Sequence, residues 1–185
     1  EPDHLLDIVQ RAQEKRALVM DNRNLKRDLA ASEGLDGRLV GHSPEMRHLK
    51  REIVDYAPTN ASILISGLTG SGKEVVARCL HDFGSTPNGP FIAVNCAAIP
   101  TQMAESEFFG HTRGAFTGAE ACRTGKLQAA SGGTLFLDEV TSTPMEVQGE
   151  LLRALGEQVV VPLGSNTAMA VLVCLVAASP EDPNQ

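Results

Sequence analysis

The 185-residue sequence has no tryptophan, one tyrosine and no apolar run long enough to span a membrane. It also lacks a C-x-x-C pair, because its four cysteines lie far apart, at Cys79, Cys96, Cys122 and Cys174. This spacing favours neither a zinc site nor a disulfide framework, so we expect buried, reduced thiols. With no signal peptide in the sequence, we expect a soluble, cytoplasmic protein.

Basic residues are also in short supply, and the formal net charge is −7. This balance argues against nucleic-acid binding by neutralisation of phosphates. The length predicts one domain with an appendage, and the 42% hydrophobic content is enough for a sizeable core. The chain opens within an expected helix and stops just after an expected strand, so we expect it to be part of a longer protein.

Glycines are concentrated in the stretch from Ser62 to Glu74, which reads as a strand, a turn and the start of a helix. Gly67, Gly72 and Lys73 have the G-x-x-x-x-G-K spacing of a phosphate-binding loop. We expect the loop glycines Gly67, Gly70 and Gly72 to take positive φ, so that backbone amides point at phosphate oxygens near the helix N-terminus. Lys73 would add a positive charge for the β- and γ-phosphates.

The stretch therefore predicts a set of nucleotide-binding residues: Gly67, Leu68, Thr69, Gly70, Ser71, Gly72, Lys73 and Glu74. Glu74 stands where Ser or Thr is usual, so no hydroxyl from this position can reach Mg²⁺ and the metal must depend on another residue. The alternative interpretation is a glycine-rich turn between a strand and a helix that binds nothing.

A second β-rich run, residues 132–139, ends in Asp138 and Glu139. The carboxyl end of a parallel strand faces the ligand crevice, so we expect Asp138 to hold Mg²⁺ and Glu139 to orient and polarise an attacking water. Further β-rich runs occur at residues 91–95, 159–161 and 171–177. Alternating strands and helices predict an α/β fold with right-handed crossovers and a parallel sheet.

Residues 4–31 are largely polar and contain neither glycine nor proline, which predicts one long helix. Four of its residues have the 4-3-4 spacing of a coiled-coil seam: Leu18, Asn22, Leu25 and Leu29. A dimerising linker and a lone amphipathic helix lying on its own domain both fit this pattern. Residues 32–37 contain two glycines and are expected to end the helix.

Residues 110–125 show no clear period and include four glycines and Phe116. A loop of this length inside a compact domain is usually functional or disordered. Phe116 could lie on a flexible finger or pack into the core, and the pattern alone leaves both open.

The residues from Gly114 to Ala119 read Gly-Ala-Phe-Thr-Gly-Ala, and here the sequence resembles the AAA+ ATPase domain of bacterial sigma-54-dependent transcriptional activators. Residues 105–111 and 125–140 are similar to the family's flanking segments, and Glu after Lys73 is typical of it. The resemblance extends over residues 39–177. Within the family, residues 16–29 and 162–166 are most similar to response regulators of four-carbon dicarboxylate transport.

The resemblance implies a P-loop AAA+ fold with three layers around a parallel sheet. It implies a linker helix at residues 1–37 and an ATPase core at residues 38–185 that stops before the helical lid. ATP and Mg²⁺ are the implied cofactors, and sigma-54 and RNA polymerase are the implied partners. Members form dimers and ring hexamers, and hydrolysis remodels the closed promoter complex. DNA binding, the arginine finger and the receiver domain would lie outside this chain, so we expect the chain alone to be inactive as an ATPase.

The resemblance also assigns roles to individual residues. Asn95 occupies the position of the switch residue that hydrogen-bonds Glu139, which completes an implied catalytic set of Lys73, Asn95, Asp138 and Glu139. Val40 and Gly41 occupy the position where the family's backbone meets adenine. The implied sigma-54 contact is the six-residue motif: Gly114, Ala115, Phe116, Thr117, Gly118 and Ala119.

Two positions depart from the family pattern. Leu68 replaces the acidic residue usual after the first loop glycine, and Pro180 stands where most members have a sensing Asn. A non-catalytic fragment that only binds nucleotide or only dimerises is therefore a second hypothesis. Another P-loop machine, such as a protein unfoldase, is a third, although the motif at residues 114–119 speaks against it.

Overall fold

The computed structural model describes residues 34–180. The expected helix at residues 4–31, with its coiled-coil seam, lies outside the described residues. The chain divides into two compact units, Glu1–Val54 and Asp55–Gln185.

The described part of the first unit is a short helical turn followed by most of a helix. Residues 34–36 are helical, and residues 37–38 form a turn. Helix α2 spans Pro44–Tyr56 and begins with a side-chain cap, because the Ser43 hydroxyl oxygen accepts a hydrogen bond from the Met46 amide at 3.2 Å. The apolar face of α2 buries Ile53, and Lys50 is also buried.

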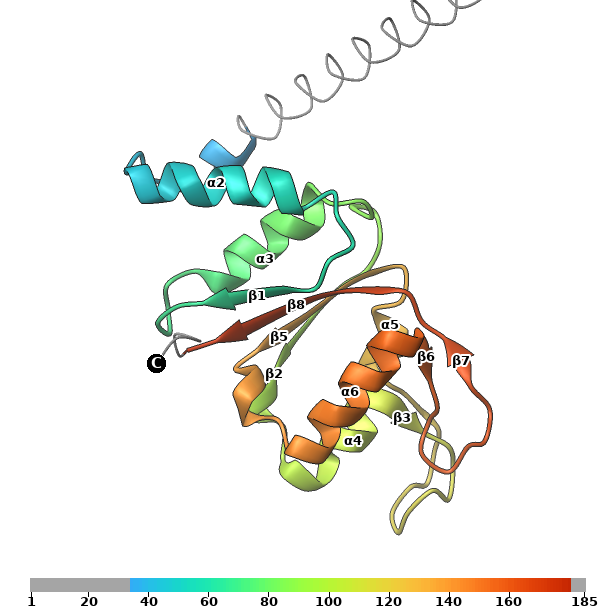
Figure 1. Ribbon diagram of the computed structural model, residues 1–185. Helices are drawn as coiled ribbons and strands as arrows, with labels where there is room; N and C mark the ends of the chain where they lie inside the picture. The colour runs from blue at the N-terminus through green and yellow to red at the C-terminus, as the bar shows by residue number, and fades with distance from the viewer. Residues whose placement is uncertain (1–33, 181–185) are drawn as a thin grey trace, which may run out of the picture. The chain divides into compact units, whose positions relative to one another are not determined.

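The second unit is built on a four-stranded sheet whose neighbouring strands are all parallel (Figure 1). The strand order across the sheet is β1 (Ile63–Ser66), β8 (Val173–Ser179), β5 (Gly133–Asp138) and β2 (Phe91–Asn95). The predicted α/β class and the parallel sheet are thus confirmed. The first and last of these strands in sequence lie side by side, so the loop after β1 and the end of β8 lie at the same edge.

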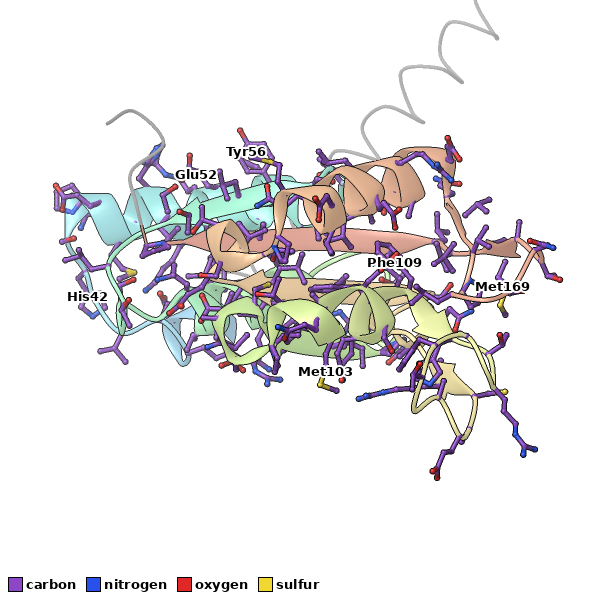
Figure 2. The ribbon with its side chains drawn as sticks, turned by 90° about the horizontal axis from the view of Figure 1, so that it is seen from below. His42, Glu52, Tyr56, Met103, Phe109 and Met169 are labelled. Carbon is purple, nitrogen blue, oxygen red and sulfur yellow. The ribbon has the colours of Figure 1, made fainter. Side chains whose placement is uncertain are left out.

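Helices cover both faces of this sheet, and the alternation along β5 shows which helix covers which face. The Thr134 hydroxyl and the His81 Nδ1 atom of α3 (Lys73–Asp82) share a hydrogen bond of 2.9 Å, so α3 covers the face to which Thr134 points. Leu135 points to the other face and packs in a cluster with Phe109. That cluster joins three further helices: α4 (Thr101–Phe109), α5 (Lys126–Ala129) and α6 (Met145–Glu157). Figure 2 shows Phe109 of α4 directed toward the sheet and Met103 on the outer side of the same helix.

Two short antiparallel ribbons lie apart from the main sheet. One pairs β3 (Gly110–His111) with β4 (Arg123–Thr124), and the other pairs β6 (Val159–Val160) with β7 (Met169–Ala170). The β-rich run at residues 159–161 therefore belongs to a ribbon and not to the parallel sheet. Among residues 34–180, no helix has both the length and the apolarity needed to cross a bilayer.

All four cysteines are free thiols. The expectation of burial is confirmed for Cys79 and Cys96, but Cys174 is only partly buried and Cys122 is exposed just before β4, so the expectation is wrong for Cys122. Small and polar neighbours allow this position to face solvent. Burial raises the pKa of the Cys96 thiol, and the negative charges of Asp138 and Glu139 act in the same direction.

These differences predict an order of thiol reactivity. In the folded chain at neutral pH, a maleimide should modify Cys122 first, while Cys96 should remain protected because it is buried and protonated. Because the pKa of Cys96 is raised in the folded state, its protonated thiol stabilises the fold below the unfolded thiol's pKa of about 8.5. This stabilisation is lost as the pH rises through the pKa that Cys96 has in the folded state. Mass spectrometry of labelled peptides checks the order, and equal labelling of Cys96 and Cys122 would contradict it.

Candidate functional site

The loop between β1 and α3 has the backbone that the glycine spacing predicts, with one exception. Gly70 and Gly72 have φ values of 82° and 91°, in the region that favours glycine. Gly67 does not have positive φ, so that expectation is wrong for it. Its lack of a side chain matters for space, because a Cβ there would lie 3.0 Å from the Ser71 hydroxyl oxygen.

Lys73 is the first residue of α3, and its side chain turns back under this loop. The side chain is buried, and its Nζ donates hydrogen bonds to the carbonyl oxygens of Gly67 at 2.9 Å and Leu68 at 3.1 Å. The ammonium group therefore lies inside the curve of the loop and close to the amides around it. Leu68 itself is 79% exposed and adds no charge to the loop.

Glu74, the next residue, points along its own helix. Its Oε1 accepts hydrogen bonds from Arg78, at 2.8 Å from one terminal nitrogen and 3.1 Å from Nε. The carboxylate is engaged with the cation one helical turn away. Position 74 therefore offers neither a hydroxyl nor an unengaged carboxylate to a metal.

The carboxyl ends of the four parallel strands bring the other candidate residues to one edge (Figure 1). Ser66 pairs with Ser179 in register, and Asn95 pairs with Asp138. The Gly67 amide also donates to the Ser179 carbonyl oxygen at 3.2 Å, which ties the loop to the end of β8. Since β8 separates β1 from β5, the loop and Asp138 start about 10 Å apart, two strand spacings.

Asp138 and Glu139 are held by a strained turn at the end of β5. Glu139 has φ 52° and ψ 47°, a left-handed conformation that costs a non-glycine residue energy. Its amide donates to the Asp138 Oδ1 atom at 3.0 Å. This bond fixes one oxygen of Asp138 at the point where the chain turns away from the strand.

Asn95, at the end of β2, has its side chain engaged within its own segment. Its Oδ1 accepts a hydrogen bond from the Ala98 amide at 3.2 Å and caps the 3₁₀ turn η1 (Cys96–Ala98). Within residues 34–180, this capping bond stands in place of the bond to Glu139 that the family resemblance implies. The switch role of Asn95 remains a prediction.

The motif Gly114–Ala119 forms the tip of the loop between β3 and β4. The loop closes on itself through a hydrogen bond from the Gly114 amide to the Ala119 carbonyl oxygen at 2.9 Å. Phe116 neither enters the core nor extends freely, because it is 47% exposed and its ring packs edge-on against His111, with ring centroids 5.0 Å apart. His111 is held in turn by the Ser106 hydroxyl at 2.6 Å.

The base of this loop is narrow, because its two ends approach closely. A Cβ on Gly125 would lie only 2.4–2.5 Å from backbone atoms of Phe108, Phe109 and Gly110, so the two ends of the loop cross where no side chain fits. An ion pair between Arg123 and Glu107, at 2.6 Å, braces the same crossing. The loop is therefore a finger anchored on α4.

Val40 and Gly41 belong to the first unit, whereas the phosphate loop belongs to the second. Val40 is 86% exposed, and Gly41 has φ 142°. The Gly41 carbonyl oxygen accepts a hydrogen bond from Lys50 at 3.1 Å. Sequence reasoning missed Lys50, because a lysine on an amphipathic helix is normally taken to face solvent.

The parallel sheet and the glycine loop with its buried lysine define a P-loop nucleotide-binding domain of the α/β class. A family model described as "Sigma-54 interaction domain" matches residues 39–185, and the chain belongs to this family.

Over the aligned residues, curated relatives are close to half identical to the chain. The C4-dicarboxylate transport transcriptional regulatory protein DctD of Pseudomonas aeruginosa is 49% identical over 183 residues, which is 99% of this chain and 40% of that protein. The response regulator protein PilR of the same organism is 47% identical over 167 residues, 90% of this chain and 38% of that protein. The chain thus spans about two fifths of the length of these relatives, and the expected similarity to response regulators is confirmed.

Solved structures agree with the family assignment. NtrX from Brucella abortus in complex with ADP superposes with a TM-score of 0.72 at 34% identity, covering 100% of this chain and 37% of that one. The complex of the same protein with ATP gives a TM-score of 0.70. The P-loop NTPase domain of an Escherichia coli sigma-54 activator, at 19% identity and a TM-score of 0.50, covers 77% of this chain and 79% of that one and shows the shared fold.

Proposed function

We propose that this chain binds ATP in the loop at residues 67–74 and that Asp138 and Glu139 drive its hydrolysis. The observation that carries the proposal is the buried Lys73 ammonium, which lies inside a loop whose conformation requires glycine at positions 70 and 72. Buried ammonium groups are rare without a charged partner, and a phosphate supplies one. NtrX, which is 34% identical to the chain, has been solved with ATP and with ADP.

The residues present also fit a magnesium ion. Mg²⁺ is usually held by one or two carboxylates together with phosphate oxygens and water, so a single half-buried acid is sufficient. Asp138 is that acid, because Glu74 is paired with Arg78 and one oxygen of Asp138 is already fixed by the Glu139 amide. Among the described residues, there is no group of three His, Cys, Asp or Glu side chains that could form an all-protein metal site. When bound, the ion neutralises phosphate charge.

Glu139 is the proposed general base. Asp138, whose Oδ1 is fixed by the Glu139 amide, serves the metal, which leaves the Glu139 carboxylate to polarise a water. Asn95 lies beside Asp138 in register and is the proposed switch. That role requires the Asn95 side chain to turn from the Ala98 amide toward Glu139.

The finger at residues 114–119 is the proposed sigma-54 contact. Its tip is exposed, with Phe116 half-exposed and Thr117 open to solvent, while its base is braced on α4. Because η1 and α4 connect Asn95 to that base, a change at Asn95 can reach the finger through one continuous segment. A closely packed base with an exposed tip fits a loop that transmits a change to a partner.

For the parent protein, we propose transcriptional activation in the cytoplasm through sigma-54 RNA polymerase, with assembly as a dimer and a ring hexamer. Residues 1–37 would form the linker helix, residues 38–185 the AAA+ core before the lid, and DNA would be bound by a domain outside this chain. Val40 and Gly41 would meet adenine through their backbone. A fragment that binds nucleotide without hydrolysing it is the second candidate, which Leu68 and Pro180 favour.

Replacement of Lys73 tests nucleotide binding directly. In Lys73→Ala, the dissociation constant for a fluorescent ATP analogue should rise about 10- to 150-fold, because a charged hydrogen bond of ~1.5–3 kcal/mol is lost. Arg153→Ala is the matched control, since it removes an exposed cation paired with Glu157 on α6. If Lys73→Ala and the unmodified chain bound the ATP analogue with equal affinity, the proposed role of the loop would be wrong.

A further inference from the structure

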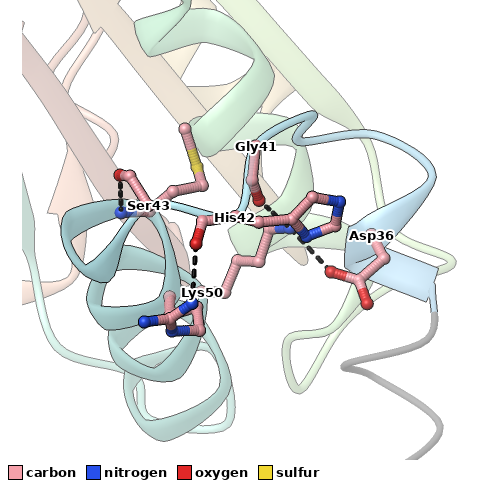
Figure 3. A network of polar contacts seen from close by, with 7 residues as sticks. Asp36, Gly41, His42, Ser43 and Lys50 are labelled. Atoms are coloured by element: carbon pink, nitrogen blue, oxygen red, sulfur yellow. Dashed lines mark hydrogen bonds and ion pairs between the residues drawn. The ribbon is translucent and has the colours of Figure 1, made fainter.

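Lys50 is a buried lysine that the nucleotide mechanism described above does not use. It lies on α2 and is 7% exposed, although a lysine at the surface of a helix normally keeps its ammonium in water. Figure 3 shows its side chain reaching away from the helix toward the segment that precedes it. A buried charge is costly unless it is paired and hydrogen-bonded, so the partners of the Lys50 ammonium are expected in the segment that precedes α2.

The Lys50 ammonium has two partners that lie on either side of a turn. Its Nζ donates to the Asp36 Oδ1 atom at 2.6 Å and to the Gly41 carbonyl oxygen at 3.1 Å (Figure 3). The hydrogen bond and the charge of Lys50 lower the pKa of the Asp36 carboxyl below its ordinary value, so Asp36 is ionised at neutral pH. One cation thus joins the end of the helical turn at residues 34–36 to the backbone at Gly41.

The backbone at Gly41 has few other restraints of its own. Its φ of 142° is a conformation that glycine adopts freely, and Val40 beside it is 86% exposed. The neighbouring bond from Arg47 to the His42 carbonyl oxygen, at 2.6 Å, is exposed to solvent, whereas the Lys50 bonds are partly buried. Lys50 is therefore the stronger restraint on the direction in which the Val40–Gly41 peptide points.

We propose that Lys50 is a positioning residue for adenine recognition, which fixes the Val40–Gly41 backbone and makes it depend on the conformation of residues 34–38 through Asp36. The inference rests on the proposed function, in which this backbone meets adenine. It extends that function with a point of regulation, because a change in the segment before α2 that moves Asp36 also releases Gly41. Lys50 touches no reacting atom, so its effect is on affinity.

The test compares ATP with inorganic tripolyphosphate, which offers phosphates without a base. Lys50→Met in the 185-residue chain keeps the aliphatic stem and removes both hydrogen bonds. It should weaken ATP binding about tenfold, equivalent to ~1.4 kcal/mol, and leave tripolyphosphate binding unchanged. Arg51→Met is the control, because it removes the same charge from an exposed position of the same helix. Thermal unfolding followed by circular dichroism confirms that both variants fold.

Asp36→Asn adds a second measurement. If Asp36 acts through Lys50, then Asp36→Asn should weaken ATP binding less than Lys50→Met, and the double variant should bind no more weakly than Lys50→Met alone. Unchanged ATP affinity in Lys50→Met, or equal losses for ATP and tripolyphosphate, overturns the inference while the proposed function stands. If the unmodified chain binds neither ligand, the proposed function fails and takes the inference with it.

Discussion

Glu139→Gln in the full-length protein should bind ATP normally and hydrolyse it about 10²- to 10⁴-fold more slowly, the range expected when a general base is removed. Glutamine has the same shape as glutamate, so the strained turn at φ 52° and the bond from the residue 139 amide to Asp138 should persist. Only the ability to accept a proton from water is lost. Steady-state phosphate release and equilibrium binding of a fluorescent ATP analogue measure the two quantities separately.

The control is Glu146→Gln, which removes an acid from the exposed first turn of α6 in the same unit. It should leave both binding and turnover unchanged. If Glu139→Gln hydrolyses ATP at the unmodified rate, Glu139 is not the base and the second hypothesis, nucleotide binding without catalysis, gains support. A loss of binding in Glu139→Gln would instead assign Glu139 to the nucleotide site itself.

Thr117→Ala should leave ATP hydrolysis intact and reduce the formation of open promoter complexes. Thr117 is exposed at the tip of the finger, while the restraints on the finger lie at its base, in the Arg123–Glu107 ion pair and the crossing at Gly125. Removing its hydroxyl should therefore leave the ATPase rate within twofold and reduce open-complex formation about 30-fold, the effect of losing ~2 kcal/mol at an interface hot spot. Transcription from a sigma-54 promoter in vitro gives the second value.

Thr167→Ala provides the comparison, because Thr167 is an exposed threonine in the neighbouring loop between β6 and β7. That loop lies against the finger, as the hydrogen bond from the Thr112 amide to the Leu163 carbonyl oxygen shows. Open-complex formation that is normal in Thr117→Ala, or equally reduced in Thr167→Ala, would contradict a specific contact at the finger tip.

Local patterns predicted most of the parallel sheet and the residues at its edge. The glycine spacing before Lys73 and the two acids after a β-rich run are local features, whereas the register that pairs Asn95 with Asp138 came only from the structure. These elements were predictable because their geometry depends on residues close together in the chain.

The features that the sequence did not predict depend on contacts between distant segments. At the base of the finger, the Gly125 backbone packs directly against the backbone of Phe109 and Gly110. The hydrophobic periodicity of the sequence does not predict this contact. Lys50 is buried only because Asp36 and Gly41 turn toward it from the preceding segment. Gly67 was expected to take positive φ and does not, which depends on how the loop folds back toward Ser71.

A crystal structure of the chain with a non-hydrolysable ATP analogue and Mg²⁺ tests the central claim most directly. The account predicts that the Lys73 ammonium exchanges the carbonyl oxygens of Gly67 and Leu68 for the β- and γ-phosphate oxygens, with Asp138 beside the metal. Phosphates bound elsewhere, with Lys73 still hydrogen-bonded to the loop carbonyls, would contradict it.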